Sequence, residues 1–166
     1  TNTVILNSGR VDVDASSDAS GSFRADSGGD GYGEAYFGIS SGAEATGIAG
    51  GDGGRVVNRK EARIEVDARA SISASANGDE YGVMGSSRDD LGSAATARAT
   101  GIAIGSGNGV IVNDGSMAVH AEGNIDVGTR SLSTTRSTHT QNWALSDAYA
   151  AGMTAGTGSH IITNTG

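Results

Sequence analysis

Histidines and scattered carboxylates are the residues with the most capacity for chemistry in this 166-residue chain. His120, His139 and His160 lie far apart, and neither a serine–histidine–acid pattern nor a metal-ligand spacing accompanies them. The adjacent Asp89 and Asp90 fall in a segment that reads as a surface loop. General acid–base catalysis needs such groups to converge on one substrate, so we expect no enzyme.

Glycine-rich segments could form a different kind of site. In GGDGYGE, residues 28–34, Asp30 and Glu34 stand beside flexible backbone and are candidates for weak cation binding. The alternative is a solvated acidic loop. No helix start or Lys-Ser/Thr pair follows the glycines, so they do not form a phosphate cradle. We expect no cofactor, with calcium as the ion left open.

Composition excludes a conventional thick core. The chain contains 28 glycines, no proline and no cysteine, and only 4% of its residues are aromatic. Its apolar fraction relies heavily on alanine, which contributes little burial free energy beside the ~1.5–3 kcal/mol of a buried Leu or Phe. Backbone pairing between many strands, packed closely through small residues, must supply the cohesion instead.

Charge and hydropathy exclude two partner classes. The net charge of −8 leaves no basic cluster to neutralise phosphates, so we expect no nucleic-acid binding. No apolar run approaches the ~20 residues that span a bilayer, so we expect no membrane insertion.

An internal repeat organises the chain. The asparagine closing each apolar triplet recurs at intervals of 51, 55 and 51 residues, as Asn7, Asn58, Asn113 and Asn164. The glycine of an AxGI-like motif keeps the same phase, as Gly47, Gly101 and Gly152. These markers predict a single domain over residues 1–166, with repeats at about 4–54, 55–109 and 110–159 and a partial fourth at 160–166.

Large apolar residues recur at one position of the repeat. Phe37 and Leu91 precede their marker glycines by ten residues, and Trp143 precedes its own by nine. We predict that all three point inward. Each asparagine is followed by alternating apolar residues, typical of a half-buried strand: Val11, Val13, Ala15; Ile64, Val66, Ala68; Met117, Val119, Ala121.

This pattern predicts an all-β protein, a parallel β-solenoid of about three imperfect repeats. Because a unit of 51–55 residues is long for one coil, we expect two or three coils in each. Stacking would bury the apolar face of each coil and pair its backbone. The four asparagines would form a ladder of side-chain hydrogen bonds at one corner. The alternative is that these asparagines merely favour turns.

Charged residues also keep the repeat register. Arg10, Asp12 and Asp14 match Arg63, Glu65 and Asp67, whereas the third repeat has Ser116, Ala118 and His120. Parallel stacking would place like charges over one another, at a cost unless arginines or a cation compensate. A solvated face of alternating charge is the simpler alternative.

The phrase G-x-G-x-x-I-x-N-x-G, followed by V-x-V-x-A and later A-x-A-x-G-I, resembles repeats of bacterial autotransporter passenger domains and related adhesins. The resemblance spans nearly the whole chain, but its motifs are short and simple. It implies a right-handed parallel β-helix on the surface of a Gram-negative bacterium. Calcium-binding nonapeptide repeats are more distantly similar, but their aspartate slot is occupied here by Thr3, Gly54, Gly109 and His160. The resemblance therefore does not extend to their calcium site.

The chain ends on the sequence motif with which each repeat begins. Val4, Ile5 and Leu6 near the start are in phase with Ile161 and Ile162 near the end. We expect these strands to meet head to tail in copies of the chain that build a filament, or to adjoin further repeats of a longer adhesin or passenger.

We therefore expect a structural or adhesive extracellular module with an unidentified glycan or surface ligand. A carbohydrate-binding or carbohydrate-active β-helix is the alternative, although few aromatic residues are present to form sugar platforms. An ice-binding solenoid is disfavoured because the Thr-rich STTRSTHT, residues 133–140, does not recur with the repeat.

Overall fold

The computed structural model describes residues 3–28, 32–81, 86–133 and 137–166, and β-strands occupy most of them. Four strands are short: β1 (Val4–Asn7), β4 (Arg55–Asn58), β7 (Val110–Asn113) and β10 (Ile161–Asn164). Six are long: β2 (Arg10–Gly28), β3 (Tyr32–Gly50), β5 (Arg63–Tyr81), β6 (Ser86–Ile104), β8 (Ser116–Ser133) and β9 (Ser137–Ala155). Among the described residues there is no helix that could cross a membrane.

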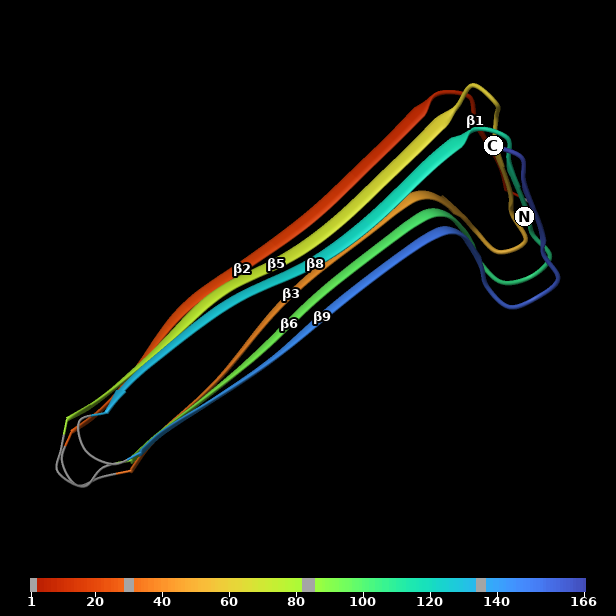
Figure 1. Ribbon diagram of the computed structural model, residues 1–166. Coiled ribbons are helices and arrows are strands. Elements are labelled where there is room, and N and C mark those ends of the chain that lie inside the picture. Colours follow the sequence, from red (N-terminus) through yellow and green to blue (C-terminus); the bar gives the residue numbers. More distant parts are fainter. Residues whose placement is uncertain (1–2, 29–31, 82–85, 134–136) are drawn as a thin grey trace.

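The strands form three parallel sheets, ordered β1-β4-β7-β10, β2-β5-β8 and β3-β6-β9. Figure 1 shows the two sheets of long strands running side by side along the molecule, with the short strands at the end that carries both termini. Each coil contains one short and two long strands, and the next coil repeats it in register. The chain is a parallel β-solenoid.

The expectation of two or three coils per repeat is wrong, because each repeat forms a single coil. A strand of 19 residues is far longer than the usual five or six. Such strands persist because apolar and polar residues alternate along them, and because the chain has no proline to interrupt a ladder.

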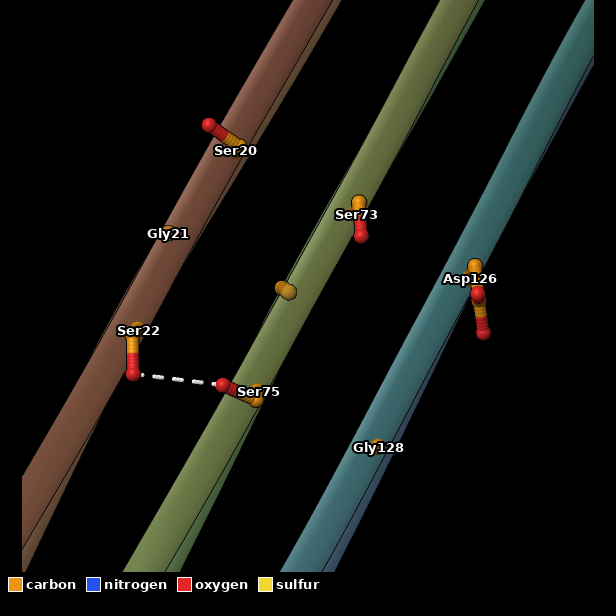
Figure 2. A pocket seen from close by; sticks show the side chains of 8 residues that line it. Ser20, Gly21, Ser22, Ser73, Ser75, Asp126 and Gly128 are labelled. Atoms are coloured by element: carbon orange, nitrogen blue, oxygen red, sulfur yellow. Dashed lines mark hydrogen bonds between the residues drawn. The ribbon is translucent and has the colours of Figure 1, made fainter.

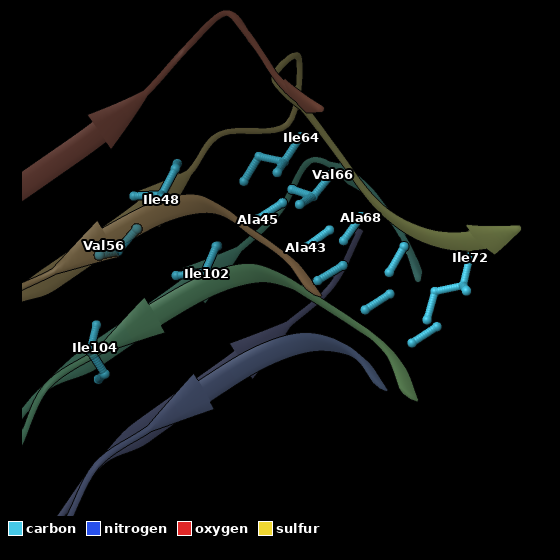
Figure 3. Packing of buried hydrophobic residues seen from close by; sticks show 14 of the residues in the cluster. Ala43, Ala45, Ile48, Val56, Ile64, Val66, Ala68, Ile72, Ile102 and Ile104 are labelled. Carbon is cyan, nitrogen blue, oxygen red and sulfur yellow. The ribbon is translucent and has the colours of Figure 1, made fainter. Parts of the chain in front are cut away.

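The core lies between the two sheets of long strands. Ile64, Val66 and Ile72 from β5 face alanines of the opposite sheet, such as Ala43 and Ala45 (Figure 3). Alanine lets the sheets come close together, so the core is thin and continuous. Most fully buried residues belong to the middle coil, whereas the outer coils contribute only Ala43, Ala45, Ile48 and Ile111 to the buried apolar set among the described residues.

The inward position predicted for Phe37, Leu91 and Trp143 holds for two of these residues. Leu91 is buried and pairs with Phe37, which stacks on Phe23 with 4.0 Å between ring centroids. The prediction is wrong for Trp143, which pairs with Gly92 and is 60% exposed. The residue paired with Leu91 is Asn142. A shift of one position in a strand moves a side chain to the opposite face.

The corners before β4, β7 and β10 are each built on a glycine with positive φ. Gly53, Gly107 and Gly158 have φ of 63°, 100° and 135°, a region that other residues rarely adopt. The corners are stacked by backbone hydrogen bonds, since the amide of Gly53 donates to Ser106 and that of Gly107 to Thr157. The G-x-G phrase thus turns the chain into the short strand at the same place in successive coils.

Candidate functional site

The two ends of the coil stack are the candidate functional surfaces. We call the outer edges of β1, β2 and β3 the N-terminal face, and the outer edges of β8, β9 and β10 the C-terminal face. Within the described chain no strand pairs with either face. A strand of 19 residues is about 60 Å long, so each face presents two long rows of unpaired peptide groups. Open edges of this kind are templates for pairing with another strand.

The apolar residues of the outer coils are only partly covered. Val66 in the middle coil is fully buried, yet its register partners Val13 and Val119 are half-buried. At the C-terminal face a hollow of about 230 Å³ opens into the core, with Met117 and Met153 in its lining. The core is therefore open to solvent at this end of the stack.

The surface area of the molecule reflects these open faces. The chain exposes 9063 Å², whereas an ordinary folded monomer of 16.4 kDa exposes about 7,500 Å². The excess of roughly a fifth arises because the stack is only three coils thick. At about 4.8 Å per coil, the backbones of the outer coils lie only about 10 Å apart.

Asparagines form a continuous ladder at the corner after the short strands. The side-chain amide of Asn7 donates to Asn58 at 2.8 Å, Asn58 donates to Asn113 at 2.6 Å, and Asn113 donates to Asn164 at 2.7 Å. Asn58 and Asn113 are buried, so these bonds satisfy polar groups that water does not reach. Asn7 also accepts a hydrogen bond from the amide of Gly9 and so holds the turn as well.

Arginines compensate the like charges stacked on the outer face of β2 and β5. Arg10 contacts Asp12 at 2.7 Å and Glu65 of the next coil at 3.3 Å. The hydrogen bond from Arg10 to Asp12, followed by the charge of that carboxylate, raises the pKa of Arg10. Arg69 contacts Asp67 at 3.0 Å. These groups are partly or largely exposed, so each pair contributes little net stability and mainly offsets repulsion within the stack.

Farther along the same face lies a shallow serine-lined groove (Figure 2). Ser22 and Ser75 are joined across coils by a hydroxyl hydrogen bond of 3.2 Å, and Ser20, Ser73 and Asp126 lie beside them. The groove is open, and its chemistry is limited to hydroxyls and one carboxylate. It does not by itself define a site.

An apolar stripe, interrupted by Asp147, runs along the outer face of β9. Trp143, Leu145 and Tyr149 alternate with inward residues and are 60%, 61% and 54% exposed. The indole of Trp143 lies over the α-carbon of Gly92, where any side chain would clash. Sequence reasoning missed this stripe because it placed Trp143 inside. Counting strand alternation back from Ala148 and Ala150 would have placed it outside.

The residues with chemical capacity remain dispersed. His120 contacts Glu122 at 3.7 Å, while His160 accepts a hydrogen bond from the amide of Gly109 at its Nδ1 atom, at 3.2 Å. No group of three or more His, Cys, Asp or Glu residues that could hold a metal occurs in the part of the chain that the structure describes. Asp30 lies outside the described residues, and only the backbone of Glu34, in β3, is described.

No family model, curated protein or solved structure matches this chain. The class of the protein therefore rests on its own geometry: a repeat protein of the parallel β-solenoid class, with one long, flat coil per repeat and an open face at each end of the stack.

Proposed function

We propose that this chain is a structural module that stacks on further coils of its own kind. Those coils belong either to other copies in an extracellular filament or to adjoining repeats of a surface adhesin or passenger. The incomplete burial of the outer coils carries the proposal, because Val13 and Val119 have the same environment as buried Val66 except for one missing neighbour. Another coil would bury them and pair the open edges.

Extending the observed register across such a junction brings compatible side chains together at two positions near the start of β2 and leaves one like-charge pair, Arg130 beside Arg24, farther along. When β2 of the next copy continues the sheet after β8, its Arg10 lies beside Ser116 and its Asp14 beside His120. Within the chain, by contrast, Arg10 stacks on Arg63 and Asp14 on Asp67. Like charges therefore stack between the first and second coils but not in the third. The third coil separates them from the same charges at the start of the next copy.

The inner columns of the same junction are also complementary. Met117 and Val119 meet Val11 and Val13 of the next copy, so the hollow at the C-terminal face receives apolar side chains. Val127 meets Gly21, and Ile125 meets Ala19, which places large residues against small ones. On the outer face of the same junction, Trp143 lies opposite Gly38, which leaves open space where its own side chain would be. The open position at Gly38 therefore accommodates Trp143, whereas the space beside the α-carbon of Gly21 is already filled by Ile39 and Phe23.

Sedimentation velocity over a concentration series, with electron microscopy of the same samples, tests self-stacking. We expect particle size to grow with concentration and filaments in which the long strands lie across the axis, with a repeat of about 4.8 Å. A purified chain that stays monomeric at high concentration, with β2 and β9 amides as protected from exchange as those of β5, would contradict the proposal in both of its forms.

A tandem chain tests stacking on adjoining repeats. Residues 1–166 followed directly by residues 10–166 would let β10 also serve as the short strand of the next coil, because residues 165–166 match the two-residue link 8–9. This chain should melt well above the single copy at a concentration where the single copy is monomeric. An equal melting temperature would argue against stacking within one chain.

Carbohydrate binding is a second candidate, favoured by the exposed aromatic rings of Trp143 and Tyr149 on one flat face. Such rings can cover the apolar face of a sugar. Tryptophan fluorescence titrated with bacterial and host polysaccharides tests this role directly, since Trp143 is the sole tryptophan. A saturable change that Tyr149→Ala weakens would support it, whereas an unchanged spectrum with every glycan would exclude Trp143 as the platform.

A further inference from the structure

The sheets do not contain equal numbers of strands, and this affects how copies can join. The sheet of short strands has four members, whereas each sheet of long strands has three. β10 therefore already occupies the short-strand place of a fourth coil, beside β7. If β2 and β3 of a second copy continue the sheets after β8 and β9, that copy's β1 falls on the place held by β10. Both short strands cannot occupy it.

The two competing strands are held differently. β1 is held by backbone hydrogen bonds to Arg55 and Arg59 and by the side-chain bond from Asn7 to Asn58. Its outward residues Val4 and Leu6 are exposed.

β10 makes the equivalent ladder bonds and further contacts at both of its ends. His160 accepts from the amide of Gly109 before the strand, and the hydroxyl of Thr165 donates to Asp114 at 2.6 Å after it. The preceding corner is also stacked on the coil below, through Thr157. Among the described residues, β1 thus makes fewer polar contacts at its ends, although β10 is the more exposed strand, with Ile161 64% and Ile162 47% exposed.

β10 matches β1 at the positions that face inward. Ile162 corresponds to Ile5, and Asn164 corresponds to Asn7, through the shared register with β4 and β7. With β10 beside β4 of the next copy, Asn164 could donate to that copy's Asn58 as Asn7 does now. The asparagine ladder would then cross the junction with one asparagine per coil.

We propose that copies of this chain join by strand replacement: β10 of one copy displaces β1 of the next from the edge of β4. β10 then pairs with its own β7 on one side and with β4 of the next copy on the other. The exchange substitutes one four-residue strand for another, so the pairing of the long strands supplies the net driving force. Until displaced, β1 covers the edge of β4 and slows association. This inference rests on the proposed self-stacking.

Engineered disulfides can clamp either short strand, and the chain has no cysteine to interfere. Leu6→Cys with Val57→Cys ties β1 to β4, while Val112→Cys with Thr163→Cys ties β10 to β7. Both pairs occupy the same outward column of neighbouring parallel strands, whose spacing of about 4.8 Å lies within the Cα range of disulfides. Each variant is compared with its own reduced form, so a folding defect in the variant is visible directly.

We expect oxidation to slow assembly at least tenfold in the β1 clamp and to leave assembly unchanged in the β10 clamp. Deleting residues 1–8 should shorten the lag before filaments appear. In assembled wild-type chain, amides of residues 3–8 should lose protection from hydrogen exchange, while those of residues 161–165 gain it.

The opposite pattern, with the β10 clamp blocking assembly, would overturn the inference, as would unchanged assembly in both clamped forms. In either case the wild-type chain still assembles, so self-stacking would stand. If the wild-type chain and the deletion variant both stay monomeric, self-stacking itself fails, and strand replacement with it.

Discussion

At the residue scale, the asparagine ladder shows how a polar side chain can stabilise a thin core. Asn58 is buried and both accepts from Asn7 and donates to Asn113. Removing it leaves the side-chain nitrogen of Asn7 and the side-chain oxygen of Asn113 unpaired, and Asn113 is buried. The cost of an unpaired buried polar group is ~1–3 kcal/mol, which exceeds the ~1 kcal/mol net gain of an ordinary hydrogen bond.

Asn58→Leu should therefore lower the free energy of unfolding by about 2–4 kcal/mol, measured by chemical denaturation at a concentration where the chain is monomeric. Asn164→Leu is the matched control, because it removes one ladder bond instead of two and leaves only the side-chain nitrogen of Asn113 unpaired, so it should cost about 1–2 kcal/mol. Equal effects at both positions would mean that the asparagines act mainly through the turn that follows.

Two buried serines on neighbouring inward positions provide a second comparison. The hydroxyl of Ser41 donates to the carbonyl of Ser17 at 2.6 Å, whereas the hydroxyl of Ser93 finds no hydrogen-bond partner among the described residues. Ser93→Ala should raise the free energy of unfolding by about 1 kcal/mol, and Ser41→Ala should lower it by a similar amount. Destabilisation by Ser93→Ala would indicate that a water molecule or a shift of the backbone satisfies the hydroxyl.

At the scale of the strand, glycine determines how closely the sheets approach. A side chain on Gly101 would meet Met117 and, at 2.6 Å, the backbone oxygen of Gly152. Because backbone cannot move aside as a flexible side chain can, Gly101→Ala should cost at least ~2 kcal/mol. Gly38 lies in the same sheet, in β3, but has open space around it. Gly38→Ala should therefore change the free energy of unfolding by less than ~0.5 kcal/mol. Thermal melts of the two variants provide the comparison.

Burial differs between coils, and substitutions at register partners in two coils can measure how much burial contributes to stability. Val66→Ala leaves a cavity in the middle coil and should cost about 2–3 kcal/mol, whereas Val13→Ala in the outer coil should cost about 1 kcal/mol, since its side chain is only half-buried. Denaturation of dilute samples gives both values. Equal costs would show that the monomer already shields its outer coils.

Strand alternation and the repeat could be predicted from the sequence, because both follow from local residue patterns. The asparagine spacing of 51, 55 and 51 residues varies because corners differ in length. The link from β4 to β5, residues 59–62, has four residues, whereas residues 8–9 and 114–115 provide only two each. Such changes do not disturb inward and outward alternation within a strand. The error at Trp143 arose within one strand, where a residue nine positions before the marker glycine was matched to residues ten positions before theirs.

Trp143 illustrates that limit. Its offset from the marker glycine was nine residues, whereas Phe37 and Leu91 had offsets of ten. In a structure with a side-chain period of two, that single residue decides between core and surface. The number of coils per repeat was misjudged for a different reason, since strands of 19 residues lie far outside the usual range. Composition alone does not predict such lengths.

At the scale of the whole molecule, three coils are few for a solenoid. One coil is covered on both sides and two on one side only, so stability should be graded across the stack. The parallel pairing joins residues more than 50 positions apart, which makes folding slow and leaves edges open while it proceeds. Each additional coil would raise the fraction of strands that have a neighbour on both sides, because it covers one edge of the stack and exposes an edge of equal size.

Hydrogen exchange should reveal this gradient and its removal. In dilute monomer we expect the amides of β5 and β6 to be the most protected, and those of β2, β3, β8 and β9 to exchange at least tenfold faster, because each outer strand lacks a neighbour on one side. In stacked coils, the outer strands acquire the environment of the middle coil, so their protection should rise to meet that of β5 and β6. Uniform protection in the monomer would show that three coils already suffice. A gradient that persists after assembly would place the contacts between copies away from the open faces and on the outer surfaces, where the stripe of Trp143, Leu145 and Tyr149 is the exposed apolar candidate.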